Sequence, residues 1–477
     1  MRLFDTDVQK LKYEVLRDVA RHAEQGRLSD CYTDIPKSIA PGPKSSMRCC
    51  VYKERAILTE RVKMALGGDR ENPNIVEVIG IACDECPVSG YQVGTGCRGC
   101  IAHRCMAACP RNAITLDEDR HAHIDPVKCI GCGKCAKACP YSAIAMHRRP
   151  CENACKVKAI HMGPDRCAEI EAEKCVACGA CVYQCPFGAI QDKSFLTEAI
   201  RILRQSEQNR AYRTYAIVAP SISSQFGYAK LGQVITALKK LGFYSVVEAA
   251  LGADMVAARE ARELAEKGFL TSSCCPAFVA YVKQYQPTLL PLVSTTPSPM
   301  AELARFIKAT DADAKTVFIG PCTAKKQERS LPDVAPYVDC VLTFEELQAW
   351  IDSRDFDIAK LPEDVLDNAS CFGRIFARSG GLSDAVAQAL TEQQSDFPLR
   401  AAVCNGLEEC AVALLKKSRG ILPENFIEGM ACVGGCIGGA GCLTHEAKDK
   451  SEVDRYASQA YEKTIADALA QCGMGKA

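Results

Sequence analysis

The sequence has no excess of charge of either sign and no long apolar run. Lys plus Arg equals Asp plus Glu at 58 each, so no strong overall field attracts a nucleic acid or an anionic membrane. The longest apolar runs, such as YAIVAP and KTVFIG, are far shorter than the roughly 20 residues that cross a bilayer. The first residues, MRLFDTDVQKLKYEVL, lack the apolar core of a secretory signal. We therefore expect a cytoplasmic protein that binds neither nucleic acid nor membrane.

Cysteine is abundant instead, with 31 among the 477 residues. A secreted disulfide scaffold is the simplest explanation, but such scaffolds are short, whereas this chain is long enough for about three domains. Seventeen of the cysteines lie in tight runs between Cys83 and Cys185. This clustering favours metal binding and marks a separate domain.

Outside the cysteine-rich block, the sequence predicts regular helices and strands. Residues 1–75 have the apolar spacing of helices. After residue 212, short apolar runs such as YAIVAP, YSVVEAA and KTVFIG alternate with amphipathic stretches such as LGQVITALKKLG. This alternation predicts an α/β fold with parallel sheets covered by helices, and ligands at the carboxyl ends of the strands.

Two stretches of the block, CIGCGKCAKACP and CVACGACVYQCP, share the spacing C-x2-C-x2-C-x3-C-P. In this bacterial ferredoxin signature three cysteines hold one 4Fe-4S cube and the fourth binds a second cube. A third run, CRGCIAHRCMAACP, has one wider gap, and CENACKVKAI keeps only the last two ligand positions. Zinc is the alternative for a C-x2-C pair, but the repeated x3-C-P extension argues against it. The block resembles two tandem ferredoxin modules, in which His103 is expected to be a solvated or hydrogen-bonded residue.

Cross-pairing within the modules predicts the ligands of each cube. The expected sets are Cys97, Cys100, Cys105 and Cys139; Cys109, Cys129, Cys132 and Cys135; and Cys155, Cys175, Cys178 and Cys181. A fourth cube needs Cys151, Cys185 and two further donors, which Cys83 and Cys86 can supply. Cys167 is left over and is an alternative ligand.

Three later stretches, TSSCCPAF, GPCTAKKQE and EGMACVGGCIGGAGC, resemble the three H-cluster signatures of iron-only (FeFe) hydrogenases. The resemblance covers about residues 210–450 together with the ferredoxin modules. In that family four cysteines hold a 4Fe-4S cube, and one of them bridges to a two-iron subsite with CO, cyanide and a dithiolate. The matching positions are Cys275, Cys322, Cys432 and Cys436, with Cys436 as the bridge. One cube needs four thiolates, so the number of cysteines agrees.

The resemblance also assigns residues around the two-iron subsite. Lys325 matches the family lysine that pairs with a cyanide, and an ammonium beside an anionic cluster is electrostatically sensible. The alternative is a solvated lysine in the basic pair Lys325 and Lys326. Pro220 and Ser221 match the segment that lines the dithiolate, and Met430 matches a packing residue.

A proton route is implied as well, because heterolytic cleavage of H2 needs a base. Cys274 resembles the proton-transfer cysteine of the family, and a relay of Cys274, Glu260, Thr295 and Glu263 would follow from it. Glu260 and Glu263 are three residues apart and can share a helix face, although the neighbouring arginines are also typical of a solvated face. Glu328 is expected to line the cavity.

Some positions depart from the common family pattern. Phe278 replaces a tryptophan, Gly320 replaces a methionine, and Cys442 and Leu443 stand where glycine, glutamine and proline are usual. These differences match a divergent branch of the family. The remaining cysteines are expected to be free, buried and hydrophobic in character: Cys31, Cys49, Cys50, Cys340, Cys371, Cys404, Cys410 and Cys472.

The resemblance implies a two-lobed α/β H-cluster domain preceded by ferredoxin-like α+β modules and a helical extension. The expected segments are a helical extension at 1–75, tandem modules at 76–192, a linker helix at 193–212, the H-cluster domain at 213–450 and a C-terminal helix at 451–477.

The implied function is reversible H2 oxidation and proton reduction, after assembly by hydrogenase maturation proteins. Electrons would pass through two to four accessory 4Fe-4S clusters, with four preferred, to ferredoxin or a similar carrier. One alternative is a non-catalytic assembly or sensory iron-sulfur protein on the same fold, whose members generally lack the lysine or the thiol base. Another is a pure electron-transfer subunit, for which the C-terminal domain would be superfluous.

Overall fold

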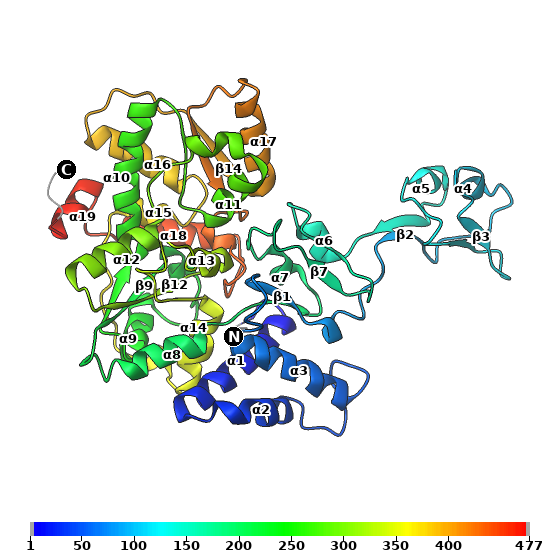
Figure 1. Cartoon of the computed structure of the whole chain (residues 1–477), viewed down its shortest axis with the longest axis horizontal. Coiled ribbons are helices and arrows are strands. Elements are labelled where there is room, and N and C mark those ends of the chain that lie inside the picture. Colours follow the sequence, from blue (N-terminus) through cyan, green and yellow to red (C-terminus); the bar gives the residue numbers. More distant parts are fainter. Residues whose placement is uncertain (1–3, 474–477) are drawn as a thin grey trace.

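The computed structural model describes residues 4–473 and has three parts (Figure 1). Helices at the N-terminal end lie against a large α/β part, and the cysteine-rich part extends away to one side. The outermost residues of the two predicted end segments, 1–3 and 474–477, lie outside the described residues.

The N-terminal part is helical, as the apolar spacing predicts. Thr6 caps the first helix, because its side chain accepts a hydrogen bond from the Gln9 amide. The buried face of this helix, which includes Val15 and Val19, packs against helix α14 of the α/β part. The N-terminal helices are α1 (Asp7–Gln25), α2 (Cys31–Ile39) and α3 (Val51–Ala65).

Two parallel sheets form the centre of the α/β part, as expected from the alternation of strands and helices. The first sheet has the strand order β10-β9-β12-β13, and the second has the order β11-β15-β14. Every pairing within them is parallel. The strands are β9 (Thr214–Val218), β10 (Ser245–Glu248), β11 (Leu270–Thr271), β12 (Lys315–Ile319), β13 (Cys340–Leu342), β14 (Ala401–Asn405) and β15 (Phe426–Met430).

Helices cover these sheets, and α10 joins the two lobes. The N-terminal half of α10 belongs to the core around the first sheet, and its C-terminal half belongs to the core around the second. None of the helices within residues 4–473 is both long and apolar enough to cross a membrane. The helices are α8 (Leu196–Gln205), α9 (Leu231–Leu241), α10 (Ala249–Lys267), α11 (Pro276–Tyr285), α12 (Pro299–Thr310), α13 (Thr323–Glu328), α14 (Phe344–Ser353), α15 (Cys371–Ile375), α16 (Gly381–Glu392) and α17 (Leu407–Ser418).

The C-terminal segment differs from the single helix that the sequence predicts. It forms α18 (Asp449–Ser458) and α19 (Ile465–Gln471). Thr464 starts the second helix, because its side chain accepts a hydrogen bond from the Asp467 amide. This cap fixes a new N-terminus where an uninterrupted helix would have continued.

The two cysteine-rich modules are nested, so the expectation that they follow one another in tandem is wrong. Strands β2 and β5 pair in antiparallel fashion, with Gly90 opposite His147, and enclose an outer module of residues 90–147. The inner module consists of residues 76–89 and 148–192 and is closed by antiparallel β1 and β8. Figure 1 shows the outer module projecting from the rest of the molecule. The elements are β1 (Val76–Val78), β2 (Gly90–Val93), α4 (Arg104–Ala107), β3 (Ile114–Leu116), β4 (Ala122–Ile124), α5 (Lys134–Ala138), β5 (Ile144–His147), α6 (Pro150–Ala154), β6 (Ile160–Met162), β7 (Ala168–Ile170), α7 (Ala180–Gln184) and β8 (Ile190–Asp192).

A buried ion network joins the three parts. Lys12 of α1 contacts Asp192 of β8 and Glu345 of α14, each at 2.6 Å. Lys326 of α13 contacts Asp192 at 2.7 Å and Glu346 at 2.9 Å. Each carboxylate therefore has a cationic partner, which is the condition under which buried charges are tolerated.

Candidate metal centre

A cavity of about 90 Å³ lies where the two lobes meet. Residues that follow β9, β10 and β12 of the first sheet line it together with residues that follow β11 and β15 of the second. This is the edge at which parallel sheets bind ligands. The four predicted cube ligands of the α/β part all line this cavity: Cys275, Cys322, Cys432 and Cys436.

Local backbone structure presents these four thiols. Cys275 stands directly before α11 and Cys322 directly before α13. Cys432 and Cys436 lie in the loop after β15, which turns at Gly435 with φ 86°. A Cβ at Gly435 would come within 2.7 Å of the Ser379 nitrogen, so only glycine lets the loop pass here.

The charges of these thiols interact. Burial, together with negative charge on Cys275 and Cys436, raises the pKa of Cys322 to about 12. Burial likewise raises the pKa of Cys436 to about 11, with Cys275 adding to the effect. The Cys322 and Cys436 thiols are therefore protonated at neutral pH until a cation displaces the protons.

The donor set fits an iron-sulfur cube. Four soft thiolates are the ligands that such clusters take. Within residues 4–473, no three His, Cys, Asp or Glu side chains converge closely enough to hold a single metal ion. A cube does not require such convergence, because each thiolate binds a different iron.

Polar groups at the wall also fit a cofactor with acceptor atoms. The Ser221 hydroxyl is buried and has no hydrogen-bond partner among the described residues. Lys325 is 8% exposed, and its Nζ donates to Glu328 Oε2 at 2.7 Å and to the Cys274 carbonyl at 3.3 Å. Pro220 and Met430 also line the cavity, whereas Glu328 does not, so the expectation that Glu328 lines it is wrong. Lys325 is therefore buried at the cavity, and Lys326 is buried in the ion network. The alternative of a solvated basic pair is wrong for both lysines.

Glu260 connects to the cavity through the residue before Cys274. The amide and the hydroxyl of Ser273 donate to Glu260 Oε1 at 3.1 and 3.2 Å, and Cys274 itself lines the cavity. Glu260 has no solvent exposure. Burial raises the pKa of Glu260 to about 7, against hydrogen bonds from Ser273 and Ser294 that lower it.

Ser294 stands between the two glutamates. Its hydroxyl donates to Glu263 Oε2 at 2.8 Å and lies near enough to Glu260 to lower the pKa of that carboxyl, while Glu260 Oε2 has no hydrogen-bond partner among the described residues. Thr295, which the sequence suggested for this link, donates to Glu263 Oε1 from its amide and its hydroxyl, each at 3.1 Å. Burial opposes ionisation of Glu263, but hydrogen bonds from Lys267 and Ser294 hold its pKa below the usual range. Ser294 is absent from the residues that the sequence predicts for the relay, although it directly precedes Thr295.

The departures from the family pattern have structural counterparts. A Cβ at Gly320 would meet Phe318 Cε1 at 2.7 Å, and Phe318 lines the cavity. The Phe318 ring therefore fills space that a side chain at position 320 would need. Phe278 is fully buried and packs on Gly429, where a Cβ would come within 2.4 Å of its ring. Cys442 donates to the Ile437 carbonyl at 3.3 Å and is outside the cavity lining.

Cysteines of the modules lie near other members of their predicted sets, and the ligand sets themselves stay predictions. In the outer module, one small cavity is lined by the second predicted set, Cys109, Cys129, Cys132 and Cys135. Burial raises the pKa of Cys105, and charge on Cys100 and Cys139 adds to the rise. In the inner module, burial raises the pKa of Cys178 to about 11, and charge on Cys175, Cys155 and Cys275 adds to it. The third set therefore adjoins the candidate centre.

The remaining cysteines are only partly as expected. Cys31, Cys340, Cys404 and Cys410 are buried, in agreement with the hydrophobic interpretation. The other four are not fully buried, with Cys49 and Cys50 exposed and Cys371 and Cys472 intermediate. For those four the expectation of burial is wrong.

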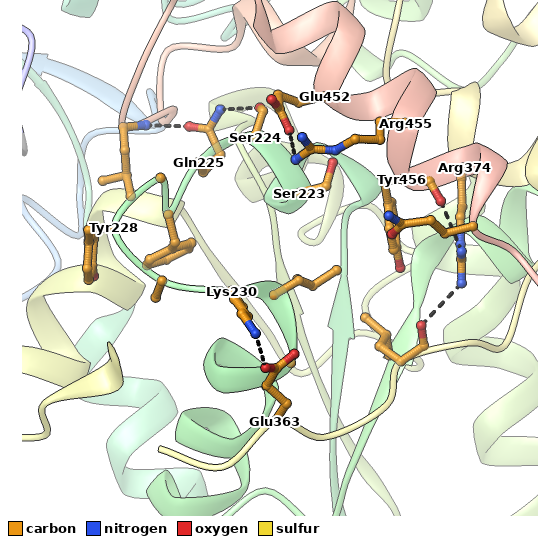
Figure 2. Close-up of a pocket in the computed structure, with 18 of the residues that line it drawn as sticks. Ser223, Ser224, Gln225, Tyr228, Lys230, Glu363, Arg374, Glu452, Arg455 and Tyr456 are labelled. Carbon is orange, nitrogen blue, oxygen red and sulfur yellow. Dashed lines mark hydrogen bonds and ion pairs between the residues drawn. The ribbon is translucent and has the colours of Figure 1, made fainter. Parts of the chain in front are cut away.

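A larger cavity of about 680 Å³ lies on the other side of the 3-10 helix η3 (Pro220–Ser224). Figure 2 shows Ser223 and Ser224 at its wall. Its charged side chains are largely paired, as Lys230 is with Glu363. Few charged side chains of this cavity are therefore free to bind a ligand. None of the predicted metal ligands lines it.

Three segments of the chain match models of known protein families. Residues 212–440 match the family described as iron only hydrogenase large subunit, C-terminal domain. Residues 96–143 match a 4Fe-4S dicluster domain, and residues 168–191 match a 4Fe-4S binding domain.

The similar proteins include hydrogenases and an iron-sulfur cluster assembly factor. The periplasmic Fe hydrogenase large subunit of Nitratidesulfovibrio vulgaris is 30% identical, and the match covers 68% of this chain and 87% of that protein. Iron hydrogenase 1 of Clostridium pasteurianum is 28% identical over 56% of this chain and 55% of its own, so the match spans about half of that relative. The cytosolic Fe-S cluster assembly factor narfl of Danio rerio is 25% identical over 54% of this chain and 79% of its own. A solved FeFe-hydrogenase structure has a similar fold, with a TM-score of 0.51 and 21% identity over 59% of this chain and 95% of that chain.

Proposed function

This chain belongs to the iron-only hydrogenase family, and we propose on that premise that it interconverts H2 with protons and electrons. The observation that carries the proposal is the convergence of two kinds of residue on one cavity. Four thiols that suit a cube line it together with Cys274 and Lys325. A thiol base and a buried ammonium are the protein groups that heterolytic H2 chemistry uses beside a metal.

The cofactor of this proposal is the H-cluster, which supplies the iron at which H2 is bound and split. Cys275, Cys322, Cys432 and Cys436 would hold its cube, with Cys436 as the bridge to the two-iron subsite. These thiols come from three separate segments, so the two lobes must be correctly packed before the set is complete.

The cavity wall prepares the site for an anionic group. Lys325 is buried, and its Nζ is held by Glu328 at 2.7 Å, so the ammonium reaches the cavity in one fixed direction. Ser221 offers a hydroxyl that no described residue uses. Met300, Phe318 and Met430 are buried at the wall, and they exclude water, which strengthens electrostatic interactions inside.

Protons would enter and leave through Cys274. The Cys274 thiol would release the proton on Sγ, and the resulting thiolate would take one back. Cys274 is close enough to Glu260 for charge on that carboxylate to raise the pKa of the thiol, and the neighbouring Ser273 holds Glu260 in place. A carboxyl group with a pKa of about 7 exchanges protons readily in both directions at neutral pH. Ser294 then leads to Glu263, whose partner Lys267 is 40% exposed. This order carries a proton from the cavity to the surface.

Electrons would move through the modules. The third set, which includes Cys178, adjoins the candidate centre, because a charge on Cys178 acts on Cys432. The outer module lies farther out and is the natural place for ferredoxin or a similar carrier to dock. Assembly of the H-cluster would depend on hydrogenase maturation proteins.

A second candidate is a non-catalytic iron-sulfur assembly protein, since several relatives are named as cytosolic Fe-S cluster assembly factors. The two candidates share the fold and the cube ligands. They differ in whether the cavity needs a proton-carrying thiol and a cyanide-pairing ammonium. Cys274 and Lys325 both line the cavity, which favours the hydrogenase.

Infrared spectroscopy and H2 turnover test the proposal. The protein is produced with hydrogenase maturation proteins, and we expect CO and cyanide bands together with H2 production from a reduced dye. Cys274→Ala should keep the bands and lose turnover by about 10²-fold or more. The matched control is Cys340→Ala, which removes a buried thiol of β13 and should leave turnover unchanged. Absence of the bands in the wild-type protein would contradict the hydrogenase proposal.

A further inference from the structure

The inner module repeats the outer one position by position. One constant offset takes Cys105 to Cys151 and Cys139 to Cys185. It also takes Arg120 to Arg166, and both of these have positive φ, 64° and 65°. The hairpin between the two strands of each module is therefore built in the same way.

The repeat lacks two cysteines at its start. The same offset takes Cys97 and Cys100 to Ala143 and Met146, which are not metal ligands. The inner module therefore has no C-x2-C pair at the positions equivalent to Cys97 and Cys100 of the outer module. The segment before the insertion contains such a pair, CDEC, at Cys83 and Cys86.

Cys83 occupies the place in the inner module that Cys97 occupies in the outer one. The Ala122 amide at the start of β4 donates to Cys97 Sγ at 3.5 Å. The Ala168 amide at the start of β7, its equivalent in the repeat, donates to Cys83 Sγ at 3.4 Å. Because the modules are nested, Cys83, which precedes the outer module in the sequence, lies at the ligand position that the repeat lacks.

The other thiols lie around Cys83. Cys83, Cys151 and Cys185 are buried in one core cluster. Burial raises the pKa of Cys86, and charge on Cys83 and Cys185 adds to the rise. Cys167 stands where the outer module has His121, and its Sγ donates to the Gly80 carbonyl at 3.3 Å. The repeat therefore assigns Cys167 no ligand position.

Two buried arginines beside these thiols have no carboxylate partner among the described residues. Arg149 is 1% exposed, and its Nη1 lies 3.9 Å from Cys83 Sγ. Its other hydrogen bonds go to the carbonyls of Pro87 at 3.1 Å, Arg166 at 2.6 Å and Cys86 at 3.5 Å.

Arg61 is the second of these arginines. It is 3% exposed and donates from Nη2 to the Phe187 carbonyl at 2.9 Å. Its Nε and Nη1 have no partner among the described residues. A charge on Cys185 acts on this guanidinium. Burying an unpaired cation is costly, so both arginines favour an anion at the neighbouring thiols.

We propose that Cys83, Cys86, Cys151 and Cys185 hold a fourth accessory 4Fe-4S cluster, and that Arg149 and Arg61 are its counter-charges. A cube with four thiolates is anionic, and one-electron reduction by the ferredoxin-type carrier adds a further negative charge. The buried guanidinium groups stabilise the reduced form more than the oxidised form. The fourth cluster therefore has a higher reduction potential than its counterpart in the outer module, where His103 takes the place of Arg149.

This cluster would hold an arriving electron within the inner module. It shares a core cluster of side chains with Cys181, which belongs to the third set, and it lies at the base of the outer module. An electron from the outer module would rest there before it moves toward the candidate centre. The inference deepens the proposed electron path and rests on that part of the proposed function.

Iron counting tests the ligand set without any measurement of H2. In protein made without maturation proteins, we expect about 20 irons per chain from five cubes, where only four cubes would give about 16. The double variant Cys83→Ala, Cys86→Ala should lose about four irons, and the control Cys167→Ala should lose none. A wild-type count of about 16, or a loss caused by Cys167→Ala, would overturn the ligand set.

A redox titration followed by electron paramagnetic resonance tests the counter-charges. Arg149→Gln should keep the full iron content and shift the midpoint potential of one cluster to more negative values. The control Arg166→Gln changes an exposed side chain and should shift no midpoint. Unchanged midpoints in Arg149→Gln at full iron content would refute the counter-charge role. These readouts stay valid if the protein has no H2 turnover, so failure of the hydrogenase proposal and failure of this inference are distinguishable.

Discussion

Lys326 Nζ lies 2.7 Å from Asp192 Oδ2, while the preceding residue, Lys325, points to the metal cavity. The two lysines are neighbours on one short helix and serve different purposes. Lys326 is fully buried and links α13 to β8 of the inner module. The helix that presents the cavity ammonium is thereby fixed to the module that would deliver electrons.

Removal of the Lys326 charge should destabilise the protein strongly. Lys326→Met leaves Glu346 without its ammonium partner and leaves Asp192 with Lys12 alone. Breaking a buried pair on one side costs about 3–5 kcal/mol. We expect a clear fall in the thermal unfolding midpoint, measured by circular dichroism under anaerobic conditions.

The control for this prediction is Lys174→Met. Lys174 pairs with Glu171 at 2.7 Å, but its side chain is 49% exposed, so the loss should stay within about 1 kcal/mol. Equal effects of the two substitutions would mean that the buried network does not stabilise the assembly of the three parts.

The buried carboxyl of Glu260 should set the pH dependence of turnover. Burial raises the pKa of Glu260 to about 7, so the group is mainly protonated below that pH and mainly ionised above it. Proton reduction needs the protonated form and should decline above pH 7. H2 oxidation needs the ionised form and should decline below pH 7.

Glu260→Gln tests this assignment, because an amide cannot exchange the proton. We expect both directions of turnover to fall by about 10²-fold or more, with the infrared bands retained. A variant with the wild-type pH profiles would show that protons take another route.

Ser294 and Thr295 can be separated as proton carriers. Ser294→Ala removes the hydroxyl between Glu260 and Glu263, and turnover should fall by about tenfold or more. Thr295→Val keeps the amide that donates to Glu263 at 3.1 Å, so the carboxylate stays in place and turnover should change little. Steady-state H2 production is the measurement. A larger loss in Thr295→Val than in Ser294→Ala would restore the assignment made from the sequence.

The space beside Gly320 should tolerate one large side chain and not two. Gly320→Met forces a side chain against the Phe318 ring, and overpacking of this kind costs about 1–3 kcal/mol. Gly320→Met combined with Phe318→Ala relieves the clash. We expect weak infrared bands in the single variant and recovery in the double variant. Strong bands in the single variant would show that Phe318 moves aside easily.

Much of the α/β part follows from the sequence. Runs such as KTVFIG are apolar on both faces, which suits a parallel strand covered by helices on both sides, and β12 forms there. The ligand positions Cys275 and Cys432 follow from motif resemblance, and the structure places both at one cavity. Local patterns succeed where a residue's neighbours in sequence determine its environment.

Other features depend on contacts between distant segments. The role of Ser294 depends on the exact turn after η4 (Pro287–Leu292), and adjacent hydroxyl residues are hard to distinguish by spacing. Arg149 looks like a surface residue in the run HRRPC, and only the fold reveals its burial. The nesting of the modules depends on the pairing of Gly90 with His147, which neither short strand indicates by itself.

That pairing has a consequence for the design of the molecule. Because Gly90 lies opposite His147, the chain leaves the inner module and returns to it at nearly the same point. Insertions are well tolerated where the two ends meet in this way. The outer module is then an exchangeable adaptor, which we expect can be replaced by another electron-accepting domain or shortened to a turn while Cys83, Cys86, Cys151 and Cys185 stay in place.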